Sequence, residues 1–184
     1  MHRDLWDGKN GHCRCVANLT IEHLGCKEWR DIDGEYTYTG KPEVEIVYTG
    51  NQFMDKLYID TVKERKTVRT MTLRGHNALH FGEGQNFFTM GIPEISLVPA
   101  PYYLCVISDT HEMEKFDIDL MTEQTETFAK LIEKIETISS KTLGRSDFYS
   151  IVKAKSVSGG YDFSLQGLTR KISETLKNRQ TRRA

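Results

Sequence analysis

Carboxylate and imidazole side chains follow three apolar segments of this sequence. The first group is Glu22-His23, after the run VANLTI; the second is the loop RGHNALHFGEGQ, with Glu83; the third is PYYLCVISDTHE, with Asp109. Oxygen and nitrogen donors from separate loops can hold a metal ion or orient a substrate where the loops meet. The same loops also carry His76, His80, Gly84, Cys105 and His111. The spacing predicts one shared site built from three strand ends.

Each group also has a purely structural interpretation. An acid at the end of a strand is more often a solvated or ion-paired surface group than a metal ligand, and a lone GEG is weak evidence for any site. His23 points away from Glu22 if the strand continues, so it is packed or faces solvent. Cys105 lies among apolar neighbours, where a thiol is usually inert packing. The spacing of the loop histidines is not diagnostic of a transition metal.

Composition excludes several functional classes. The net charge is −1, so there is no basic field of the kind that attracts nucleic acid. No run approaches the roughly 18 apolar residues of a membrane span, and residues 1–15 lack the apolar stretch of a signal peptide. Four cysteines in 184 residues show no zinc-ribbon or disulfide-framework spacing. We therefore expect reduced thiols, a cytoplasmic location, and neither a nucleic-acid nor a membrane partner.

Two helices have clear signals at their amino ends. Asn51 can cap a helix over 52–66, in which apolar residues recur at helical spacing. Asp117 can cap a longer helix over 118–138, whose apolar stripe is the most regular in the sequence. A short helix is expected in NFFTMG, ended by Gly91. Further helices are expected near 145–154 and 164–178, after a loop that begins beyond Ser139.

The strands are shorter and less uniform. Apolar or alternating patterns predict strands over 13–21, 67–73 and 94–99. The aromatic and Thr-rich stretch between Tyr36 and Tyr48 predicts a half-exposed hairpin that turns at 40–42. Strands interleaved with helices indicate an α/β fold, in which helices cover the faces of a sheet. We place a domain over 1–140 and a helical extension or tail over 141–184, with a locally basic end.

Three stretches, taken in order, resemble the C-terminal half of zinc aminopeptidases with two co-catalytic metals. This is the bacterial leucyl aminopeptidase and glutamate carboxypeptidase group of zinc exopeptidases. The stretches are TIEHLG (20–25), GEGQNFFTMGIPEISLV (82–98) and LCVISDTHEMEKFD (104–117). The resemblance covers about 15–138. It implies a three-layer α/β sandwich with a mainly parallel sheet, present as its C-terminal half.

The resemblance also implies roles for particular residues. Glu22 stands where the family has a zinc-binding Asp, so zinc is the implied cofactor and Glu22 its implied ligand. Glu83, Gly84 and Asp109 fall in the stretches that shape the substrate pocket, and the implied substrate is a peptide. The family's zinc-binding His falls at Cys105, and its Ser-Asp-His stretch is Gly-Glu-Gly in this sequence. The family's remaining ligands and its general base lie upstream of the stretch corresponding to Glu22.

Two classes of function remain open. The chain is either a peptidase-like fragment that is inactive alone, or a non-catalytic binding or scaffold domain that kept the peptidase fold. In both cases the sheet edge where the other half would lie needs a missing N-terminal half, a partner chain or a second copy. A third interpretation is an unrelated α/β domain.

Overall fold

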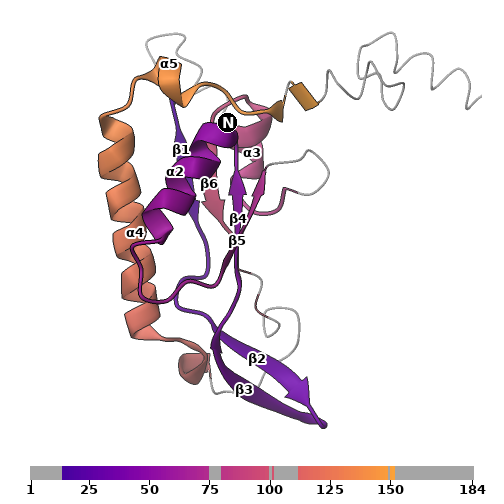
Figure 1. Ribbon diagram of the computed structural model, residues 1–184. Helices are drawn as coiled ribbons and strands as arrows, with labels where there is room; N and C mark the ends of the chain where they lie inside the picture. The colour runs from indigo at the N-terminus through magenta and orange to yellow at the C-terminus, as the bar shows by residue number, and fades with distance from the viewer. Residues whose placement is uncertain (1–13, 75–79, 100, 102–111, 149, 152–184) are drawn as a thin grey trace, which may run out of the picture. The chain divides into compact units, whose positions relative to one another are not determined.

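The structure is a computed structural model that describes residues 14–74, 80–99, 101, 112–148 and 150–151 (Figure 1). The chain divides into two units, 1–147 and 148–184, and every element below belongs to the first. The predicted sites at Cys105 and Asp109 lie outside the described residues. So does the helix predicted over 164–178.

A four-stranded sheet with the order β1-β6-β4-β5 forms the centre of the first unit. Its strands are β1 (Asn18–Ile21), β4 (Glu45–Thr49), β5 (Thr70–Arg74) and β6 (Glu94–Leu97). β1 runs parallel to β6 and β4 runs parallel to β5, whereas β4 and β6 are antiparallel. The predicted α/β fold with mostly parallel strands is thus confirmed at this level, and the sheet is mixed.

A separate two-stranded hairpin follows β1. It consists of β2 (Lys27–Ile32) and β3 (Glu35–Pro42), joined at Asp33-Gly34. Both turn residues have positive φ, 54° and 87°, which is the backbone of the two-residue turns that suit hairpins. The prediction of a turn at 40–42 was therefore wrong. The stretch after 42 belongs to β4 in the main sheet, because the Asp-Gly pair sets the turn earlier.

The helix caps expected from the sequence are confirmed. Asn51 accepts a hydrogen bond from the Met54 amide (2.9 Å) before α2 (Gln52–Val62), and Asp117 accepts one from the Leu120 amide (3.0 Å) before α4 (Ile118–Glu136). Both helices end a few residues earlier than predicted. The shorter helices are α3 (Gln85–Thr89), α5 (Ser140–Leu143) and the 3-10 helix η2 (Glu112–Lys115). α3 was predicted, whereas the loop expected after Ser139 begins with α5, which that serine caps.

The two faces of the sheet differ in polarity because side chains alternate along each strand. On one face, Ile95 and Leu97 of β6 and Val47 of β4 pack into the apolar core with α2 and α4, which lie side by side (Figure 1). Glu94 and Ser96 of β6 point to the opposite face. These are the apolar face and the polar face of the sheet.

One buried charge interrupts the apolar face. Glu45 of β4 is paired with Arg65, which follows α2, and one of the two contacts is 2.9 Å long. Gln124 of α4 donates to Glu45 (2.7 Å) and accepts from the Gly25 amide (2.6 Å). These bonds tie α4 to β4 and to the turn after β1, so they fix where the end of β1 lies.

Candidate functional site

The end of β1 meets the turn at 82–84. Glu22 follows β1 directly, and its Oε1 accepts a hydrogen bond from the Glu83 amide at 2.9 Å. Gly82 packs against the same oxygen with φ of +84°, so a side chain at this position would be strained and would collide with Glu22. The structure therefore brings together two of the three strand-end groups that the sequence singled out.

The other predicted groups have different positions. The Glu83 side chain is exposed, and Gly84 is buried. His23 is exposed and has φ of +52°, so the strand does not continue through it. Asp109, the third predicted group, lies outside the described residues.

A buried histidine and carboxylate lie beside this turn. His80 Nε2 is hydrogen-bonded to Glu94 Oε1, and both side chains are 0% exposed. The imidazole is stacked between two rings: Tyr48 at 4.6 Å and Phe88 at 5.4 Å between ring centroids. Burial raises the pKa of the Glu94 carboxyl, although His80 and Asn18 oppose this shift. Burial also raises the pKa of the Tyr48 hydroxyl.

Sequence reasoning misses Glu94 because it stands as the first residue of an ordinary predicted strand. The available signal is an acid beginning an otherwise apolar run, EISLVP, directly after Gly-Ile-Pro. His80 is one of several loop histidines in the sequence. Nothing in its spacing from Glu94 indicates the pairing, because the contact depends on how the loop crosses the sheet.

Two side-chain oxygens of β6, one in this pair and one next to it, have no hydrogen-bond partner. They are Glu94 Oε2 and Ser96 Oγ, both fully buried. Gly84 closes over them: a Cβ at this position would lie 2.6 Å from Ser96 Oγ and 2.8 Å from Glu94 Oε2. Only glycine fits at position 84, because any side chain would overlap both residues of β6.

The described residues do not complete a zinc site. Nowhere in the described part of the chain do three His, Cys, Asp or Glu side chains lie together as metal ligands. A structural or catalytic zinc needs three or four protein donors. Glu22 offers one carboxylate, and one of its oxygens already accepts the Glu83 amide. Any zinc held by Glu22 would need donors from beyond the described residues.

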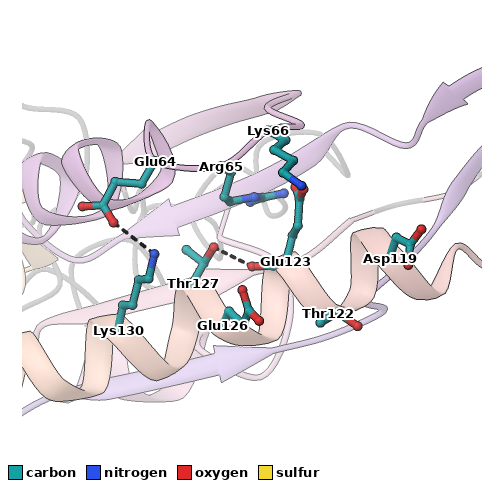
Figure 2. Close-up of a pocket in the computed structure, with 9 residues that line it drawn as sticks. All are labelled: Glu64, Arg65, Lys66, Asp119, Thr122, Glu123, Glu126, Thr127 and Lys130. Carbon is teal, nitrogen blue, oxygen red and sulfur yellow. Dashed lines mark hydrogen bonds and ion pairs between the residues drawn. The ribbon is translucent and has the colours of Figure 1, made fainter.

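A polar groove of about 520 Å³ lies between α4 and the turn after α2 (Figure 2). Lys130 of α4 contacts Glu64 across it at 3.1 Å, and the Thr67 amide donates to Glu123. The Arg65 guanidinium at its wall is already paired with Glu45. The groove is lined by Glu64, Arg65, Lys66, Asp119, Thr122, Glu123, Glu126, Thr127 and Lys130. Arg65 and Lys130, two of the cations of this groove, are thus already paired with acids of the same chain. We therefore place the candidate site on the polar face of the sheet instead.

Comparisons with protein-family models, with curated proteins and with solved structures found no match. Among the described residues, no helix combines the length and apolar character needed to cross a membrane.

Proposed function

We propose that this chain is an aminopeptidase-like peptide hydrolase domain of the zinc-exopeptidase type that is inactive alone. The observation that supports the proposal is the contact between Glu22, at the carboxyl end of β1, and the turn at 82–84. From the resemblance in sequence, we expect the acid at position 22 and the turn at 82–84 to meet. The three-layer sandwich of the complete fold, with zinc as its cofactor, belongs to the same proposal.

The direction of the strands supports this location for a substrate. β1 and β6 are parallel, so their carboxyl ends lie at the same end of the sheet. In α/β folds, ligands commonly bind at the carboxyl ends of the strands. Gly82 lies between Glu22, after β1, and Val98, after β6. A peptide bound at this end would be adjacent to Glu83 and Gly84. Asp109, which the resemblance also implies for the pocket, lies outside the described residues.

A second candidate is a non-catalytic binding or scaffold domain that uses the same fold. The observation that favours it is the hydrogen bond that Glu22 already makes. Its Oε1 accepts the Glu83 amide and so holds the turn at 82–84 in place. In this case the acid is structural, and the domain acts by joining a partner chain or a second copy. β1 pairs only with β6 among the described residues, so its other edge is where such a chain would add.

Metal binding by the full chain separates the two candidates. Cobalt(II) titration, followed by visible absorption and calorimetry, is compared between the wild type and Glu22→Gln. The amide introduced by this substitution keeps an acceptor for the Glu83 amide but is a poor metal ligand, so the fold is retained. The peptidase proposal expects at least about a tenfold loss of affinity, because one charged donor is removed.

Glu83→Gln is the matched control, since it removes a neighbouring exposed carboxylate. It should leave cobalt affinity unchanged. Cobalt binding that is absent, or equal in the wild type and Glu22→Gln, contradicts the peptidase proposal and favours the scaffold. Sedimentation of the same samples then shows whether the chain assembles with itself.

A further inference from the structure

Residues 80–84, called the strap, cross the polar face and are fastened to it at three points. His80 bonds to Glu94 at the amino end of β6, and the Glu83 amide bonds to Glu22 at the carboxyl end of β1. Between these bonds, Gly84 packs directly on Ser96. The strap is therefore attached to two strands through polar groups, and the rings of Tyr48 and Phe88 pack against His80.

The hydrogen bonds of His80 fix how many protons the buried pair holds. Its Nδ1 lies 3.1 Å from the backbone oxygen of Phe81, which can only accept, so Nδ1 carries a proton. The bond between Nε2 and Glu94 then contains one further proton. The pair is either imidazolium with carboxylate or imidazole with carboxylic acid, and its net charge is zero in both forms.

We propose that the strap opens and closes as a unit over the polar face, and that the proton shared by His80 and Glu94 holds it closed. Closure leaves Glu94 Oε2 and Ser96 Oγ buried without partners, and opening hydrates both atoms. The two unpartnered oxygens therefore destabilise the closed state, whereas the hydrogen bond between His80 and Glu94 stabilises it. Opening exposes a carboxylate, a hydroxyl and an imidazole together.

Loss of the shared proton to solvent removes the bond. It leaves a buried carboxylate facing an unprotonated ring nitrogen, and both atoms are then acceptors. The groups that face the pair are Asn18 of β1 and Ser96 of β6, with the rings of Tyr48 and Phe88 against the imidazole. Among the described residues, the charged groups at this turn are the acids Glu22 and Glu83. Neither acid can replace the proton.

The direction of the pH effect follows from proton counting. In the open state the last proton leaves near the ordinary histidine pKa of about 6.5. In the closed state burial disfavours the charged carboxylate and raises the pKa of Glu94, so loss of the shared proton leaves a less stable buried anion. Closure is therefore most stable between about pH 4.3 and about pH 6.5, and it weakens as pH rises, because the open state then releases a proton that the closed state holds.

Hydrogen–deuterium exchange of the full chain tests the proposal. Protection of amides in 80–88, corrected for intrinsic exchange, is followed from about pH 6 to about pH 9. We expect it to fall by about tenfold per pH unit while one proton is released on opening. Amides of β4, which report on global unfolding, should stay protected over the same range.

Two substitutions sharpen the test. Glu94→Gln replaces the titrating acid with an amide that can donate to neutral His80, so strap protection should become independent of pH. Glu22→Gln removes a charge from the other end of the strap and should keep the pH dependence of the wild type. Wild-type protection that does not change with pH overturns the proposal, as does an equal fall in Glu94→Gln.

Nitrogen chemical shifts of the His80 ring provide a measurement that needs no variant. The shifts should show a proton on Nδ1, which faces the Phe81 oxygen, and a hydrogen bond between Nε2 and Glu94. An unprotonated Nδ1, or an Nε2 without a hydrogen bond to Glu94, would contradict the shared proton.

Discussion

The apolar and polar faces of the sheet use neighbouring residues of one strand in opposite ways. Ile95 is fully buried in the core formed with α2 and α4, whereas Ser96, the next residue, is equally buried without a hydrogen-bond partner. Both positions exclude water, but only the first stabilises the fold by doing so. The apolar face therefore holds the domain together, whereas the polar face buries the Glu94 and Ser96 oxygens that have no hydrogen-bond partner.

The largest expected effect lies on the apolar face. Ile95→Ala should lower the free energy of unfolding by about 2–5 kcal/mol, because it opens a cavity in a close-packed core. Urea denaturation measures this change as a shift in midpoint at constant slope. Met71→Ala in β5, where the side chain is 46% exposed, is the control and should change stability by less than about 0.5 kcal/mol. Equal effects at the two positions would contradict the assignment of the core.

The second effect lies where the strap contacts the polar face. Gly84→Ala should lower the free energy of unfolding by about 1–3 kcal/mol, because the added methyl overlaps Ser96 and Glu94. The backbone at this residue is helical, with φ of −63°, so the loss reflects crowding and not backbone strain. Thermal denaturation gives the size, and amide exchange in 80–88 shows whether the strap loosens first.

Gln85→Ala is the control for this substitution. It adds alanine at the next, exposed position of α3 and meets no such contact. A Gly84→Ala protein as stable as Gln85→Ala would mean that the strap does not lie tightly on β6.

The parts of the fold that were predictable are those set by local chemistry. Asn51 and Asp117 could be identified as caps because a capping side chain bonds to an amide three residues away. The β2–β3 turn is also set by local residues, Asp33-Gly34, but the aromatic pattern that follows them predicted a turn at 40–42. The antiparallel pairing of β4 with β6 was not predictable, because it joins segments separated by two helices and a strand.

The candidate site also contains one contact that the sequence predicts and one that it does not. The meeting of Glu22 with the turn at 82–84 could be expected, because both follow predicted strands. The pairing of His80 with Glu94 could not, because it depends on the path of the strap and on two aromatic rings from separate elements. The unpartnered oxygen of Ser96 is invisible in a sequence, since a serine in a strand usually finds a partner.

The smallest predicted effect has the opposite sign to the others and compares two buried serines. Ser96→Ala should raise the free energy of unfolding by about 1 kcal/mol, because it removes a buried hydroxyl that has no partner. Ser146 is 5% exposed, and its hydroxyl donates to the Phe88 oxygen at 2.6 Å. The Phe88 oxygen keeps the Gly91 amide as a donor, so Ser146→Ala should lower the free energy of unfolding by about 0.5–1.5 kcal/mol. Urea denaturation of both variants measures the contrast, and a loss of stability in Ser96→Ala would mean that the hydroxyl is bonded when the strap is closed.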